Sequence, residues 1–149
     1  MVVMTGSWPV ASLDPVRRLN VLASAVSGAE VVTRVIPAPF ADVWAVASDL
    51  EGGFGTFEPD MRSVTVVSDT VALARSKYGL RARFAVDLRP GWLWMQSRFL
   101  LIGLAATPVE GGTLFAATGG VRIPGRAALV PFGVRRANAR ALERLAARF

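Results

Sequence analysis

The sequence predicts an α+β domain of about six to seven antiparallel strands and a long C-terminal helix, with an extra helix near the N-terminus. Between residues 61 and 121, short apolar segments alternate with tight turns, as in an antiparallel sheet. After Pro124 and Gly125 the apolar residues recur at helical spacing to the end of the chain. The 149 residues, 52% of them hydrophobic and 19% charged, match one domain with a substantial core.

The first part of the chain predicts two helices and one strand. Asp14 can cap the amides of a helix over 15–27, and Pro15 suits its first position. Val31 to Ile36 is rich in β-branched residues and predicts a strand that ends at two prolines. The spacing of apolar residues then predicts a helix over 39–48, followed by a glycine-rich link that contains Phe54 and Phe57.

The middle of the chain predicts a succession of strands. Residues 80–89 alternate apolar and charged side chains, which is typical of a half-buried strand. Pro90 and Gly91 predict a two-residue turn after it. The predicted strands are 62–67, 71–76, 80–89, 92–99, 100–107 and 114–121.

The turn at Pro90-Gly91 sets which side chains share a face of the sheet. With two turn residues, an inner apolar face forms and Trp92 and Trp94 lie outside, near Asp87 and Arg89. A change of one residue in the turn would instead turn both tryptophans inward. The favoured register pairs Leu88 with Leu93, Val86 with Met95, Phe84 with Ser97, and Ala82 with Phe99.

A local signature runs VVTRVIPAPFADVW from Val31 to Trp44 and continues with Ala47-Ser48-Asp49. It is followed by an aromatic-plus-proline turn at Phe57-Glu58-Pro59 and, near the C-terminus, by Leu142-Glu143-Arg144-Leu145. Together with the order of the elements, these segments resemble the START-like helix-grip superfamily, SRPBCC, which includes lipid-transfer domains and polyketide cyclases. The resemblance covers residues 29–149 and leaves 1–28 as an N-terminal extension with a short helix.

The resemblance implies a curved sheet that grips the C-terminal helix around an apolar cavity. The implied function is binding or carriage of a small hydrophobic ligand, such as a lipid, an isoprenoid or a polyketide-like molecule. The alternatives are a polyketide cyclase/aromatase-like enzyme and a protein-interaction or dimerisation module. The predicted ligand contacts, each of which an ordinary core would also contain, are Phe54, Phe57, Phe84, Val86, Met95, Ser97, Phe99, Phe115 and Phe132.

The composition removes several kinds of chemistry. The chain has no cysteine and no histidine, and therefore lacks thiol catalysis, disulfides and the commonest general base. We predict no catalytic residue, no metal site and no cofactor. Tyr78, the only tyrosine, is expected at an exposed turn, and Arg81, Arg83 and Asp87 are expected on the solvated face of their strand.

The net charge of +6 comes entirely from residues 122–149, which hold seven arginines and one glutamate. Arg136, Arg140, Arg144 and Arg148 form a stripe at i,i+4 spacing, interpreted as a solvated helix face. Residues 42–60 hold five acidic side chains and no basic one, so pairing with the stripe of a second copy makes a homodimer possible. We expect no nucleic-acid partner, no membrane span and a cytoplasmic location.

Overall fold

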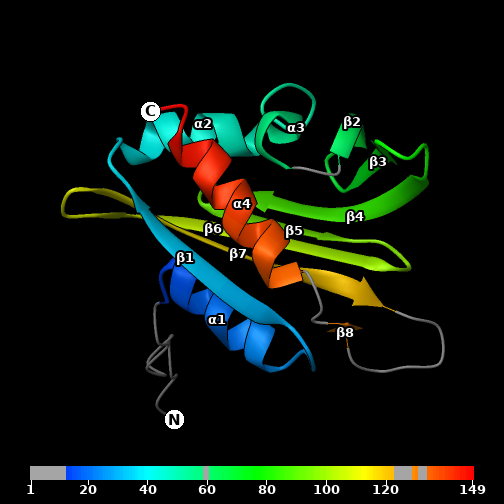
Figure 1. Cartoon of the computed structure of the whole chain (residues 1–149), viewed down its shortest axis with the longest axis horizontal. Helices are drawn as coiled ribbons and strands as arrows, with labels where there is room; N and C mark the ends of the chain where they lie inside the picture. The colour runs from blue at the N-terminus through cyan, green and yellow to red at the C-terminus, as the bar shows by residue number, and fades with distance from the viewer. Residues whose placement is uncertain (1–12, 59–60, 123–128, 131–133) are drawn as a thin grey trace, which may run out of the picture.

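The computed structural model describes residues 13–58, 61–122, 129–130 and 134–149, and for residues 122, 129–130 and 134 the backbone alone. The helices are α1 (Pro15–Ser24), α2 (Phe40–Ser48), α3 (Phe54–Phe57) and α4 (Val134–Ala146). Two helices, α1 and α4, lie on opposite faces of a curved antiparallel sheet, next to its edge strand β1 (Glu30–Ile36) and the neighbouring β7 (Gly112–Arg122) (Figure 1).

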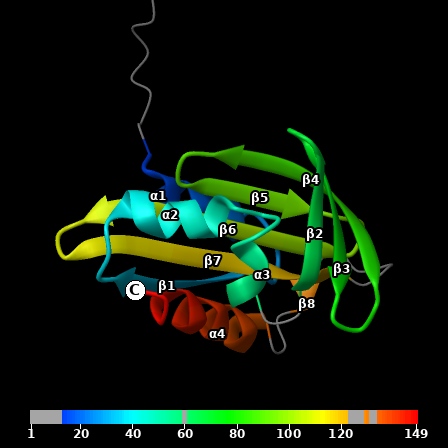
Figure 2. The same ribbon diagram turned by 90° about the horizontal axis from the view of Figure 1, so that it is seen from above.

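Seven strands form one open antiparallel sheet in the order β1-β7-β6-β5-β4-β3-β2, and the short β8 pairs with β7. The α+β prediction is confirmed. The strands are β1 (Glu30–Ile36), β2 (Met61–Ser68), β3 (Val71–Ser76), β4 (Arg81–Arg89), β5 (Trp92–Gln96), β6 (Leu100–Val109), β7 (Gly112–Arg122) and β8 (Leu129–Val130). Figure 2 shows β2 and β3 running across the direction of β5, β6 and β7.

The long strands β6 and β7 meet because a glycine turn joins them. Gly111 and Gly112 both have positive φ, a conformation that glycine adopts without steric cost. A Cβ on Gly112 would also collide with the carbonyl oxygen of Ile36, where β1 ends. The hydroxyl of Thr113, fully buried, donates to the Ala38 carbonyl oxygen at 2.8 Å and fixes the chain as it leaves β1.

The hairpin register predicted from Pro90-Gly91 is confirmed for its first pairs: Leu88 lies opposite Leu93, and Val86 opposite Met95. The further pairs of Phe84 with Ser97 and of Ala82 with Phe99 are wrong, because β5 ends at Gln96. The Ser97 hydroxyl accepts from the amides of Phe99 and Leu100 and thereby starts a turn into β6.

Three other boundaries differ from the predictions. The glycine-rich link contains the one-turn helix α3, in which Phe54 and Phe57 pack edge to face with ring centroids 5.4 Å apart. The segment after Gly125 is not helical throughout, since β8 precedes α4. The first helix ends at Ser24 rather than at residue 27. The predicted loose segment 1–12 lies outside the described residues.

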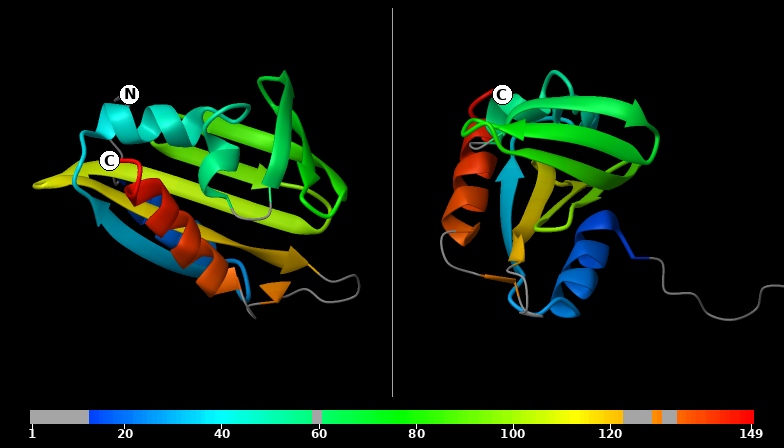
Figure 3. Two further views of the ribbon diagram at one scale, coloured as in Figure 1. Left: turned by 45° about the horizontal axis from the view of Figure 1, so that its top comes forward. Right: turned by 90° about the vertical axis from the view of Figure 1, so that its right-hand side faces the viewer.

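The N-terminal helix covers the outer face of the sheet. The right-hand view of Figure 3 shows α1 and α4 on opposite sides of β1 and β7. Val16, Leu19 and Ala23 of α1 are buried, and this helix contacts β6, β7 and β1. A second small cluster, beside the main core, therefore forms outside the sheet.

Trp92 and Trp94 lie on this outer face, as the favoured register predicted. Their rings stack with centroids 6.0 Å apart, and the Arg18 guanidinium of α1 lies 5.4 Å from the Trp92 ring. The Trp92 indole nitrogen donates to a carboxylate oxygen of Asp87 at 3.2 Å. Trp92 is thus buried under α1 with its polar atom satisfied.

Candidate functional site

Most of the predicted ligand contacts gather in the main core. The side chains of this group are at most 8% exposed, and they lie between the inner face of the sheet and the helices α2, α3 and α4. Burial is equally compatible with a packed core and with contact to an enclosed ligand, so their role stays a prediction. The six residues are Phe54, Phe57, Phe84, Val86, Met95 and Phe115.

The other three predicted contacts lie elsewhere. Ser97 is at the β5–β6 turn, where its hydroxyl serves the local backbone. Phe99 is 45% exposed at the same turn, with the Arg98 guanidinium 5.4 Å from its ring centroid. Phe132 lies outside the described residues. The structure therefore does not bring Ser97 and Phe99 together with the core group.

A cleft of about 580 Å³ opens on the inner face of the sheet, between the link that follows α2 and the strands β2, β3 and β4. Its floor is apolar: Ala72 of β3 and Val86 and Leu88 of β4 all lie on the inner face. Phe84, which pairs with Ala72 across the strands, is completely buried next to this floor. The cleft, which we name the inner cleft, is lined by Ser48, Asp49, Leu50, Glu51, Val66, Ser68, Asp69, Val71, Ala72, Val86 and Leu88.

The link that forms one wall of the inner cleft is fixed at several points. Asp49 accepts from the Gly52 amide at 3.1 Å, and its own carbonyl accepts from the Phe54 amide at 2.8 Å. Gly53 lies so close to α2 that a Cβ there would collide with the Val46 carbonyl oxygen. Glu51 accepts from the Val66 amide at 2.9 Å. The wall is thereby attached directly to the edge strand β2.

The rim of the inner cleft is acidic. Asp49 and Glu51 lie on the link and Asp69 on the β2–β3 turn, and the lining contains no basic side chain. Carboxylates at the mouth of an apolar floor favour cations and repel anions. Among the described residues, no group of three carboxylates is placed to hold a metal ion.

Most lining residues of the inner cleft were absent from the sequence-based site. Val86 was included, and the strand alternation had already placed Leu88 and Ala82 on the inner face. The alternation could have added Leu88 to the site. The wall residues Asp49, Glu51 and Leu50 carry no such signal, because their position depends on how the link folds back over the sheet.

The tyrosine and arginine side chains that a cyclase-like enzyme would use in catalysis do not line the inner cleft. Tyr78 is at an exposed hairpin tip, and Arg81 and Arg83 are exposed on the outer face, both as predicted. Asp87 also lies on the outer face with its side chain 47% exposed, as predicted, and it binds Arg89 at 3.0 Å as well as the Trp92 indole. One polar donor does lie inside: the Asn138 side-chain nitrogen of α4 is buried without a hydrogen-bond partner in the described part of the chain.

The four arginines of the C-terminal stripe are exposed, as expected for a solvated helix face. Arg148 nonetheless donates to the Thr56 hydroxyl at 2.7 Å and connects the end of the chain to α3. The predicted homodimer stays a prediction. No helix among the described residues is long and apolar enough to cross a membrane.

An open antiparallel sheet with a C-terminal helix on its inner face is a START-like helix-grip fold, as the sequence resemblance predicted. The chain is similar to the START superfamily protein of Mycobacterium smegmatis, with a TM-score of 0.62 and 13% identity over 80% of this chain and 95% of that one.

Two further solved structures show the same fold. The KanY protein matches with a TM-score of 0.63 and 18% identity over 80% of this chain and 95% of that one. The protein XoxI from Bacillus cereus matches with a TM-score of 0.65 and 10% identity over 81% and 94%. No protein-family model matches the chain, and no curated protein does. These comparisons therefore show the fold, and the function has to be argued from the site.

Proposed function

We propose that the protein binds or carries a small, mainly apolar molecule, such as a lipid, an isoprenoid or a polyketide-like compound, and that this molecule occupies the inner cleft. The observation that supports this most is the apolar floor of Ala72, Val86 and Leu88 at an opening of the inner face. A volume of about 580 Å³ is within the range of small-molecule sites. Burial of apolar area supplies most of the affinity, at about 25 cal/mol per Å².

The acidic rim narrows the chemistry of the ligand. Asp49, Glu51 and Asp69 surround the opening without a compensating cation in the lining. A ligand whose head group is neutral or an amine enters without electrostatic cost, whereas a carboxylate is repelled. The favoured ligand is therefore an apolar body with an uncharged or cationic end.

Native mass spectrometry of the purified full chain, followed by organic extraction, tests the carrier function directly. We expect a co-purifying apolar compound, or a one-to-one complex after addition of the neutral probe Nile red. A protein that arrives empty and binds no apolar probe contradicts the proposal.

A matched pair of substitutions tests the location of the site. Val66 lines the inner cleft on β2, whereas its neighbour Val67 is exposed and absent from the lining. Val66→Trp fills the opening, so we expect at least tenfold weaker Nile red binding, and Val67→Trp leaves it unchanged. Equal affinities for the two variants would place the ligand elsewhere.

The charge preference has its own test. Dodecylamine and dodecanoic acid present the same chain with opposite charges, and we expect the amine to bind more tightly. In Asp49→Asn/Asp69→Asn this preference shrinks, because two of the three rim charges are gone. A preference that the double variant leaves intact would show that the rim does not contact the head group.

A further inference from the structure

The β3–β4 hairpin has an exposed apolar tip. Tyr78 and Leu80 are 73% and 71% exposed, more than any other large hydrophobic side chain described. The tip is an ordered turn: Ser76 accepts from the amides of both residues through its hydroxyl, and its carbonyl accepts from Gly79. Gly79 supplies the positive φ that the turn requires. The two apolar side chains are therefore held outward by a defined backbone.

The same hairpin is strongly basic. Residues 70–86 contain four basic side chains, Arg75, Lys77, Arg81 and Arg83, and no acidic one. Arg75 lies directly opposite Arg81 across the two strands, an arrangement of like charges that destabilises a sheet. In the described part of the chain, ion pairs join Arg17 to Asp14 and Arg89 to Asp87, and none involves these three arginines.

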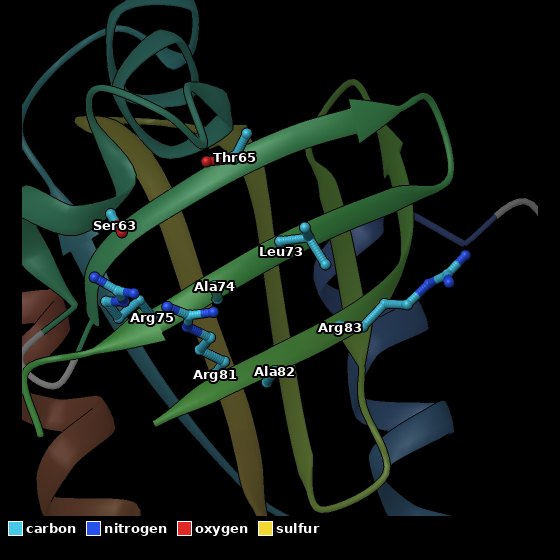
Figure 4. A pocket seen from close by; sticks show the side chains of 8 residues that line it. All are labelled: Ser63, Thr65, Leu73, Ala74, Arg75, Arg81, Ala82 and Arg83. Carbon is cyan, nitrogen blue, oxygen red and sulfur yellow. The ribbon is translucent and has the colours of Figure 1, made fainter. Parts of the chain in front are cut away.

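Three of these side chains, Arg75, Arg81 and Arg83, line a hollow on the outer face of β2, β3 and β4. It has a volume of about 440 Å³, and Ser63 and Thr65 of β2 also line it. Figure 4 shows Arg75 and Arg81 side by side on neighbouring strands, with Arg83 pointing away from them. Guanidinium and hydroxyl groups are donors that bind the oxygen atoms of a phosphate group, and the lining contains no carboxylate. We name this surface, with the tip, the basic hairpin.

We propose that the basic hairpin docks the protein onto an anionic phospholipid surface, with Tyr78 and Leu80 entering the interfacial layer and Arg75, Arg81 and Arg83 binding headgroup phosphates. A free phosphate compound would explain the arginines but would leave the exposed tip without an apolar partner. A bilayer surface offers a partner for both groups. Aromatic and aliphatic side chains partition into its interfacial layer, and cationic side chains bind its phosphates.

The charges elsewhere on these strands agree with this orientation. Asp69 lies at the β2–β3 turn, at the opposite end of β3 from the tip, and it belongs to the acidic rim of the inner cleft. Docking through the tip therefore keeps the rim away from the anionic surface. The proposal is independent of ligand binding in the cleft, and either can fail alone.

Co-sedimentation of the full chain with vesicles tests the docking. We expect binding to vesicles of equal parts phosphatidylcholine and phosphatidylglycerol, weak binding to phosphatidylcholine alone, and loss of binding as salt rises. Arg75→Gln/Arg81→Gln/Arg83→Gln should lower the partition coefficient on the order of 100-fold, since each basic residue near such a surface contributes roughly fivefold. Tyr78→Ser/Leu80→Ser should lower it about tenfold at unchanged charge.

Arg136→Gln/Arg140→Gln/Arg144→Gln is the matched control, because it removes three exposed arginines from α4. We expect this control to retain the wild-type partition coefficient. If both triple variants lose vesicle binding equally, the net charge of the protein alone explains the binding, and the proposal is overturned. An unchanged circular dichroism spectrum and an unchanged thermal unfolding midpoint establish that each variant is folded.

Two other results would also overturn the docking. Stoichiometric binding of inorganic phosphate with no binding to anionic vesicles would make the hollow a site for a free phosphate compound. Binding of a single-stranded oligonucleotide without vesicle binding would assign the tip and its arginines to nucleic acid.

Discussion

The two halves of the sheet are built differently. The half formed by β5, β6, β7 and β1 is covered on both sides, by α1 outside and by α2 and α4 inside. The half formed by β2, β3 and β4 has the inner cleft on one side and the arginine-lined hollow on the other. The inner face of the second half is thus only partly covered: Phe84 is buried in the main core, whereas Val66 and Leu88 are 43% and 40% exposed.

Both of the binding surfaces proposed above lie on the half formed by β2, β3 and β4. Fully buried residues such as Leu104 and Ala116 contribute packing on both faces of the covered half. The open half has exposed apolar groups and a cross-strand pair of like charges, and such a pair reduces stability. We infer that the covered half supports the open half, and substitutions in the two halves should have different consequences.

The largest expected effect is the loss of the contact between α1 and the sheet. Leu19→Ala removes a fully buried side chain from the outer cluster and should lower the free energy of unfolding by about 2–5 kcal/mol. Leu88→Ala, in the exposed floor of the inner cleft, should cost less than about 1 kcal/mol. Urea unfolding measures both values, and comparable losses would refute the distinction between the halves.

A smaller effect is expected where α1 approaches the sheet backbone. A Cβ on Gly103 would lie 2.9 Å from a Thr118 methyl and 3.1 Å from a Leu19 methyl, so Gly103→Ala must shift side chains between α1 and the sheet and should cost about 1–3 kcal/mol. Gly55 of α3 has its nearest such neighbour at 3.7 Å, and Gly55→Ala should be neutral or slightly stabilising. If Gly103→Ala leaves the thermal unfolding midpoint unchanged, α1 packs loosely against the sheet.

The Asp14 cap at the N-terminus of α1 should contribute about 1 kcal/mol to the free energy of unfolding. Asp14 accepts from the Arg17 amide at 3.0 Å and caps the helix, so Asp14→Ala removes this bond. Asp14→Asn keeps a capping oxygen and should retain most of the stability. If the two variants unfold at the same urea concentration, then the carboxylate charge, and not the cap, is what stabilises α1.

The smallest expected effect concerns the open half and is local. Glu51→Ala leaves the Val66 amide of the edge strand without its partner, which should speed hydrogen exchange of that amide at least tenfold. Global stability should fall by only about 0.5 kcal/mol, because the site is exposed. Glu51→Gln keeps an acceptor oxygen and serves as the control. Unchanged exchange in Glu51→Ala would indicate that the wall of the inner cleft is not held by this bond.

Much of the fold could be predicted because its signals are local. The alternation over 80–89 placed Phe84 and Val86 inside and Arg81 and Arg83 outside, and the Pro90-Gly91 turn placed Trp92 and Trp94 on the outer face. The prediction failed at Phe99, where the Ser97 hydroxyl ends β5 after Gln96. The hydrogen bonds of one side chain to the local backbone accompany the end of the strand, and periodicity in the sequence does not reveal them.

Sequence patterns predicted less of the candidate site than of the fold. Sequence patterns identify an apolar face but cannot separate side chains that fill a core, such as Phe115, from side chains at an opening, such as Leu88. The basic hairpin illustrates the same limit. Its four basic residues can be read from the sequence, but which strands are neighbours decides that Arg75, Arg81 and Arg83 have no ion pair within the described ranges.

By itself, the sequence determined the α+β class, the order of most elements, the hairpin register at Pro90-Gly91 and the exposed position of Tyr78. These features depend on periodicity, turn residues and caps, which act over a few residues. The tertiary structure decided that α1 covers the tryptophans, that the link after α2 forms a wall of the inner cleft, and that one half of the sheet stays open. These features depend on contacts between residues far apart in the chain, which local preferences do not specify.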